Sequence, residues 1–173
     1  MKTTKIIFVL ILSTFIISLF TFSISRNEVF AETTKGMNVG QEAPSFKLLT
    51  VDGKKLDLES FRKDKTVLLV FGATWCPSCK HEVPFLKGYY DRFKGDGLKV
   101  LNVDIQESRK KVSSFVDKNN ISYPVVLDEE ADVAVLYGIS GIPLNILLDK
   151  DGVIRYRDND LPDIDDVKRL LVN

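Results

Sequence analysis

The sequence Thr66-Val67-Leu68-Leu69-Val70-Phe71-Gly72-Ala73-Thr74-Trp75-Cys76-Pro77-Ser78-Cys79 runs from an apolar, β-branched segment directly into a pair of cysteines. Its first six residues are typical of a central strand that is covered on both faces. From Pro77 to about Phe93, apolar residues recur at helical spacing, and a Gly-Asp-Gly sequence follows. Two cysteines separated by two residues, where a strand gives way to a helix, predict a redox-active pair.

The start of a helix gives the two thiols different expected roles. Unpaired N–H groups and the helix dipole at the first turn stabilise the thiolate of Cys76, which makes it the expected nucleophile. Cys79 lies one turn deeper and is expected to be shielded and to act as the resolving thiol. Pro77 suits the first helical turn, where its missing N–H does no harm. Trp75 either offers a flat apolar surface to an extended substrate segment or packs in the core.

Two structural explanations of the cysteine pair fit the sequence poorly. A tetrahedral zinc site needs four ligands, and besides the two cysteines the chain has a single histidine, His81. A static disulfide that closes so short a loop would constrain the unfolded chain very little. We therefore expect no metal site and no cofactor beyond a redox-active Cys76–Cys79 disulfide.

The remaining pattern predicts an α/β domain with a mixed central sheet flanked by helices. An N-terminal hairpin turns at Asp52-Gly53, and further strands are expected over 98–104, 125–127, 144–148 and 153–156. A short helix is expected from Ser60, and longer ones over 108–118, 131–137 and 163–171.

The N-terminus predicts export. Lys2 and Lys5 precede an apolar run over residues 6–24, which is long enough to cross a bilayer. Val29-Phe30-Ala31 would also suit cleavage by a signal peptidase, so residues 1–31 are either a signal peptide or a signal anchor. Residues 32–42 are expected to be a tether, and residues 43–173 the domain. No cysteine follows the apolar run to accept a lipid.

The charge balance excludes nucleic acid as an expected partner. The chain has 24 basic and 24 acidic side chains, and removal of residues 1–31 leaves 24 − 3 = 21 basic and 24 − 1 = 23 acidic ones. Both cysteines lie in the exported part, where thiols can be oxidised. The expected location is extracytoplasmic, either membrane-anchored through residues 6–24 or secreted or periplasmic after cleavage near Ala31.

The segment from Phe71 to Pro84 resembles the active site of thioredoxin-like proteins, and more closely that of the exported TlpA/ResA family. The resemblance runs from about Val39 to the C-terminus and implies a thioredoxin fold with an N-terminal β-hairpin and an αβ insert over 108–127. Pro84 matches the proline that kinks the active-site helix. Pro143 matches the proline that the family holds in cis opposite the cysteines, which would expose the backbone of Ile142 to an extended substrate.

Thioredoxins proper carry a buried aspartate six residues before the first cysteine, where this chain has Val70. The TlpA/ResA family instead has a glutamate three residues after the second cysteine, and Glu82 matches it. That spacing puts both side chains on one helical face, so Glu82 either accepts the proton of Cys79 or is a solvated surface carboxylate. Leu144-Asn145 departs from the threonine-rich pair that is common in the family, which leaves substrate choice open.

The resemblance implies a thiol-disulfide oxidoreductase that reduces protein disulfides, with apocytochrome c as one substrate class. The implied electron donor is a membrane thiol carrier of the CcdA/DsbD type. Oxidation or isomerisation of secreted proteins is the alternative that uses the same chemistry. A peroxidase of the peroxiredoxin type and a copper-binding protein like the Sco proteins fit less well, because the spacing of Thr74, Cys76 and Cys79 differs from theirs.

Overall fold

The computed structural model describes residues 34–172, and the expected signal or anchor segment lies outside them. The strands are β1 (Lys47–Thr50), β2 (Lys55–Asp57), β3 (Thr66–Gly72), β4 (Leu98–Ile105), β5 (Val125–Asp128), β6 (Leu144–Leu148) and β7 (Ile154–Asp158). The helices are α2 (Pro77–Phe93), α3 (Arg109–Lys118), α4 (Asp132–Leu136) and α5 (Ile164–Val172), with 3-10 turns η1 (Leu58–Phe61) and η2 (Lys94–Asp96). None of these helices is long and apolar enough to cross a membrane.

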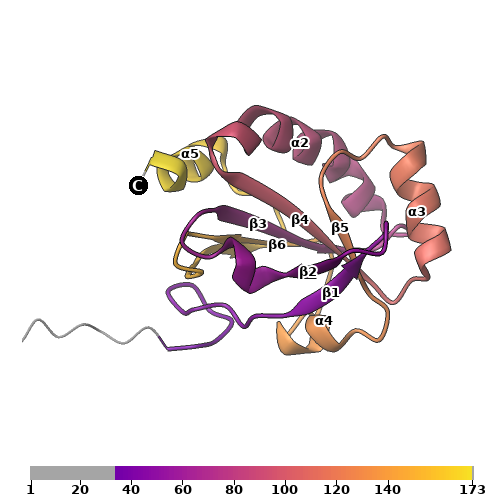
Figure 1. The fold of residues 1–173 in the computed structure, drawn as a ribbon, viewed down its shortest axis with the longest axis horizontal. Coiled ribbons are helices and arrows are strands. Elements are labelled where there is room, and N and C mark those ends of the chain that lie inside the picture. The colour runs from indigo at the N-terminus through magenta and orange to yellow at the C-terminus, as the bar shows by residue number, and fades with distance from the viewer. Residues whose placement is uncertain (1–33, 173) are drawn as a thin grey trace, which may run out of the picture. The chain divides into compact units, whose positions relative to one another are not determined.

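All the strands form one mixed sheet in the order β2-β1-β5-β4-β3-β6-β7 (Figure 1). The apolar strand β3 lies inside the sheet between β4 and β6, and its seven residues are all buried. It pairs in parallel with β4 and antiparallel with β6, and the hairpin β1-β2 joins the sheet antiparallel to β5. The predicted thioredoxin-like arrangement of a mixed sheet and flanking helices is therefore confirmed.

Two apolar cores lie on opposite faces of the sheet, because successive residues of β3 point to opposite sides. Leu69 and Phe71 belong to the core that also contains Val133 and Tyr137 of the α4 region. Leu68 and Val70 belong to the core that contains residues of α2, α3 and α5 (Figure 1). The core that contains Leu68 and Val70 therefore holds the first residues of α2 above the carboxyl end of β3.

The short helix expected from Ser60 is η1, which begins two residues earlier. The side chain of Asp57 accepts a hydrogen bond from the N–H of Glu59 at 3.0 Å and so caps the turn before Leu58. Leu58 itself is buried in the core, and the turn therefore follows β2 directly.

Residues 34–44 pack against the domain by backbone hydrogen bonds. Glu42 forms isolated bridges with Lys35 and with Val153, and the N–H of Gly40 donates to the carbonyl of Ile154 at 2.8 Å. The hydrogen-bonded domain therefore reaches Thr34, upstream of the start expected near Ala43. Backbone bridges need no side-chain periodicity, so the polar composition of residues 32–42 did not reveal them.

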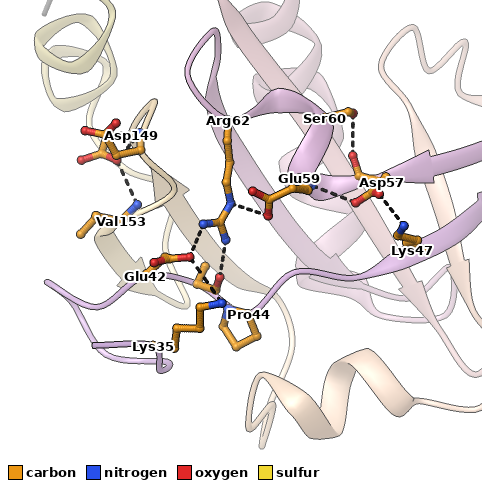
Figure 2. A network of polar contacts seen from close by, with 12 residues as sticks. Lys35, Glu42, Pro44, Lys47, Asp57, Glu59, Ser60, Arg62, Asp149 and Val153 are labelled. Carbon is orange, nitrogen blue, oxygen red and sulfur yellow. Dashed lines mark hydrogen bonds and ion pairs between the residues drawn. The ribbon is translucent and has the colours of Figure 1, made fainter. Parts of the chain in front are cut away.

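Arg62 anchors this N-terminal segment (Figure 2). Its guanidinium group forms ion pairs with Glu42 and, at 2.9 Å, with Glu59, and donates a hydrogen bond to the carbonyl of Ala43 at 2.9 Å. The Arg62 side chain is 15% exposed, so these interactions are partly removed from water. A charge-assisted cluster of this kind is stronger than a surface ion pair.

We predict that Arg62→Met lowers the free energy of unfolding by about 2 kcal/mol, because it leaves partly buried acceptors without their donor. The measurement is urea denaturation of the full-length chain. Lys94→Met is the matched control: it removes an exposed ion pair with Asp91 and should cost less than about 1 kcal/mol. Equal losses in the two variants would contradict the assigned role of Arg62.

Candidate active site

The two cysteines lie where β3 ends and α2 begins. Cys76 is the N-cap residue of α2 and is joined by a disulfide bond to Cys79, with the two Cα atoms 5.3 Å apart. The N–H of Cys79 donates to Sγ of Cys76 at 3.1 Å. This hydrogen bond and the positive end of the helix dipole favour negative charge on Cys76 once the disulfide opens. The predicted nucleophile thus lies at the N-terminus of a helix.

The exposures of the two cysteines differ from the expectation. Cys76 is 3% exposed, whereas Cys79, expected to be the shielded residue, is half-buried. Sγ of Cys76 lies 3.8 Å from the carbonyl oxygen of Ile142, which belongs to the segment that faces the cysteines. Cys79 packs under Gly72, where a Cβ atom would come within 3.3 Å of its sulfur. Glycine is needed there to let the thiol approach β3.

The predicted substrate-facing residues surround Cys76. The side chain of Trp75 is 60% exposed, so it does not pack in the core. Pro77 is also exposed and is the first residue of α2. The Ile142–Pro143 peptide bond is cis, and it precedes β6 directly. The exposed side chain of Trp75 and the Ile142–Pro143 segment, both predicted to face the substrate, therefore lie next to Cys76.

Glu82 is buried, which excludes the solvated surface carboxylate. The residue is 8% exposed, and one carboxylate oxygen accepts a hydrogen bond from the side-chain amide of Asn145 at 3.1 Å. Burial, and to a smaller extent the charge of Asp160, raise the pKa of Glu82 to about 7 against the opposing effect of the Asn145 hydrogen bond. The carboxyl group can therefore exchange a proton near neutral pH.

Asn145, which the sequence marked only as a departure from the family pattern, links this acid to the substrate-facing loop. Its amide group also donates to the carbonyl of Asn159 at 3.4 Å, and the side chain of Asn159 donates to the carbonyl of Pro143. Asn145 is fully buried. A buried polar residue in the apolar strand Leu144–Leu148 was the sequence signal for this role.

Two further acids near the cysteines were missed. Asp104, near the end of β4, is 3% exposed, and Glu107, between β4 and α3, is 5% exposed. Glu107 accepts hydrogen bonds from the backbone N–H and the hydroxyl of Thr74, two residues before Cys76, and forms an ion pair with Lys111. The signal was available in the sequence, because one acid lies in the apolar strand expected over 98–104 and the other follows it after two residues.

Glu107 and Asp104 have opposite ionisation preferences. Burial tends to raise the pKa of Glu107, but hydrogen bonds from Lys111 and Thr74 outweigh it and hold that pKa below its usual range. Burial and the neighbouring Glu107 raise the pKa of Asp104 to about 8. At neutral pH, Glu107 is therefore a carboxylate that holds the active-site loop, and Asp104 is mostly a neutral acid.

Thiol-disulfide exchange is the chemistry that such a helix start supports, so the protein is a thioredoxin-like redox protein. The AhpC/TSA family matches residues 39–157. Proteins named thiol-disulfide oxidoreductase ResA are 35% identical over 118 residues in Bacillus thuringiensis (68% of each chain) and 34% identical over 128 residues in Bacillus subtilis (74% of this chain, 70% of the relative). The chain belongs to this ResA family of thiol-disulfide oxidoreductases.

A solved structure agrees with this assignment. The thioredoxin domain of a thiol-disulfide oxidoreductase from Bacteroides vulgatus is 26% identical and superimposes with a TM-score of 0.71. The match covers 80% of this chain and all of that one.

We predict that Glu82→Gln changes the pH dependence of stability. A folded-state pKa of about 7 for Glu82, above its ordinary value of 4.5, means that the folded wild type binds the extra proton between these two pH values. The free energy of unfolding of the wild type therefore falls as pH rises from 5 to 8. The glutamine variant lacks this contribution, so the curves of unfolding free energy against pH for the two proteins should diverge by up to about 3 kcal/mol. Urea denaturation of the disulfide form at pH 5, 6, 7 and 8 measures the divergence.

The matched control is Glu129→Gln, which removes an exposed carboxylate. Its curve should stay parallel to that of the wild type. If Glu82→Gln also stayed parallel, the carboxyl group of Glu82 would not titrate in this range in the folded protein.

Proposed function

We propose that this thiol-disulfide oxidoreductase works as a reductant of disulfide bonds in extracytoplasmic proteins. The observation that carries the proposal is the placement of Cys76 at the N-cap of α2, where its sulfur accepts the Cys79 N–H beside the cis Ile142–Pro143 segment. A helix N-terminus stabilises the thiolate that must attack the substrate. The sequence between the cysteines, Pro77-Ser78, has no histidine that would add further stabilisation and favour an oxidant.

The reaction proceeds by two exchanges. The Cys76 thiolate attacks one sulfur of the substrate disulfide, which forms a mixed disulfide and releases one substrate thiolate. Cys79 then gives up its proton and attacks Sγ of Cys76, which releases the second substrate thiolate and forms the Cys76–Cys79 disulfide. The substrate gains two electrons and, from solvent and the protein, two protons. Glu82 is proposed to accept the proton of Cys79, since its pKa of about 7 suits that transfer near neutral pH.

The proposed substrate class is apocytochrome c and comparable exported proteins with reducible disulfides. The ResA family membership and the exposed apolar surface at Trp75 support this choice. A substrate segment would lie extended across Trp75 and pair with the backbone of Ile142. The cysteine pair itself is the only redox group that the mechanism requires.

Electrons must return to the disulfide after each turnover. The proposed donor is a membrane thiol carrier of the CcdA/DsbD type, and the proposed location is extracytoplasmic. The support lies in the sequence, where two lysines precede the apolar residues 6–24. These residues would either hold the domain at the membrane or be removed after export.

The direction of electron flow is tested by the reduction potential of the Cys76/Cys79 couple. We predict a value well below that of glutathione, measured by equilibrating the full-length chain with glutathione and dithiothreitol. Cys79→Ser should accumulate a mixed disulfide with a protein substrate, and Cys76→Ser should form none. A potential well above that of glutathione would make the protein an oxidant or isomerase, and rapid peroxide consumption would make it a peroxidase.

The role of Trp75 is tested by comparing protein and small-molecule disulfides. We predict that Trp75→Ala lowers kcat/KM for a protein disulfide about tenfold, because a stacked aromatic contact of about 1 kcal/mol or more is lost. Reduction of a small aliphatic disulfide should change little. Val135→Ala, which truncates another exposed apolar side chain on α4, is the control and should leave both rates unchanged. Equal losses on both substrates would show that Trp75 supports the cysteines instead of the substrate.

A further inference from the structure

A small cavity lies behind Cys79. It has a volume of about 20 Å³, and its lining includes Cys79 of α2, Asp104 of β4 and Tyr123 before β5. Glu82 does not line it. A cavity of this size holds about one water molecule when polar partners are available. The cavity therefore connects Cys79 to an acid that the exchange steps above do not use.

Asp104 has a buried carboxyl group beside this cavity. One of its carboxylate oxygens is buried and has no hydrogen-bond partner among the described residues. Asp104 pairs in register with Gly72, where an added Cβ atom would lie 3.3 Å from the Cys79 sulfur. The side chain of Asp104 therefore lies on the α2 face of the sheet, where it lines the same cavity as Cys79. A buried oxygen without a hydrogen-bond partner lowers the stability of the fold, so such an oxygen usually has a bound water molecule or a functional role.

We propose that Asp104 is a positioning residue that gives a proton to Cys79, through a water molecule in this cavity, when the disulfide is opened. The inference rests on the proposed function in taking Cys76 and Cys79 as the working pair. It adds Asp104 to Glu82 as a second acid that exchanges a proton with Cys79.

The step balances as follows. A thiolate of the electron donor attacks Sγ of Cys76, the Cys76–Cys79 bond breaks, and a mixed disulfide forms with the donor. Cys79 leaves as a thiolate and takes the proton from the neutral carboxyl group of Asp104, which becomes a carboxylate. When Cys79 later attacks a mixed disulfide with substrate, Glu82 accepts its proton, and the carboxylate of Asp104 regains its own proton from solvent.

The surroundings of Asp104 keep its proton available at neutral pH. The charged and titratable groups that face it are Glu107, Lys111 of α3, Tyr123 and Cys79. Burial and Glu107 raise the pKa of Asp104 to about 8, and Lys111 opposes this in part. The carboxyl group is thus a proton donor below about pH 8 and loses that ability as pH rises further.

The test is the rate at which dithiothreitol opens the disulfide of the full-length chain between pH 6 and 10, corrected for the thiolate fraction of dithiothreitol. A Glu82→Gln background removes the acid to which the exchange steps above assign the proton of Cys79. We expect the corrected rate to fall as pH rises through about 8. Asp104→Asn should be roughly tenfold slower at pH 6, and its corrected rate should not depend on pH.

Asp128→Asn is the matched control. Asp128 is equally buried, lies on the neighbouring strand β5 and accepts hydrogen bonds from the first residues of α4. This variant should lose stability and keep the wild-type pH profile. An Asp104→Asn variant with the wild-type rate and profile would overturn the proposal.

A second measurement uses unaltered Asp104 and so does not depend on the variant folding. The carboxyl carbon of Asp104, followed by NMR as a function of pH, should have different midpoints in the disulfide and dithiol forms, because the Cys79 thiol shares its cavity. Identical midpoints would overturn the proposal. A high reduction potential would overturn the proposed direction alone, since both tests of Asp104 are independent of it.

Discussion

The chemistry of this protein depends on the geometry at one helix N-terminus. The buried strand β3 ends at Gly72, and Cys76 caps α2 four residues later, with its sulfur accepting the N–H of Cys79. Only a strand covered on both faces fixes that helix end firmly enough to keep the contact in place. The loop between them is held from the other side, because Glu107 binds both the backbone and the hydroxyl of Thr74.

The buried acids near the cysteines lower the free energy of unfolding when they ionise. Glu82 and Asp104 both have a raised pKa, so each binds a proton more tightly in the folded protein than in the unfolded chain. Their ionisation destabilises the fold as pH rises. Two apolar cores, one on each side of β3, offset this loss of stability. A site of this kind trades stability for proton exchange near neutral pH.

Much of this arrangement follows from the sequence. Strong periodicity and the Cys-Pro-Ser-Cys motif predicted the mixed sheet, the helix from Pro77 to Phe93 and the cysteine pair. The sequence did not predict the contacts of Thr34 to Ala43, since they are backbone bridges. It did not predict the relative exposure of Cys76 and Cys79 either, because that depends on how closely Ile142 and Gly72 approach each sulfur. Local patterns specify elements, whereas such distances arise from tertiary packing.

Val70 occupies the strand position at which thioredoxins proper carry a buried aspartate. Its neighbours in register are Asn102 on β4 and Asn145 on β6, which share its face of the sheet. Asp104 lies one step further along that face, beside Gly72. An apolar residue behind the cysteines is therefore flanked by polar groups supplied by both neighbouring strands. Because strand register decides which side chains meet, β4 brings the carboxyl group of Asp104 to the face of the sheet on which β3 carries Val70.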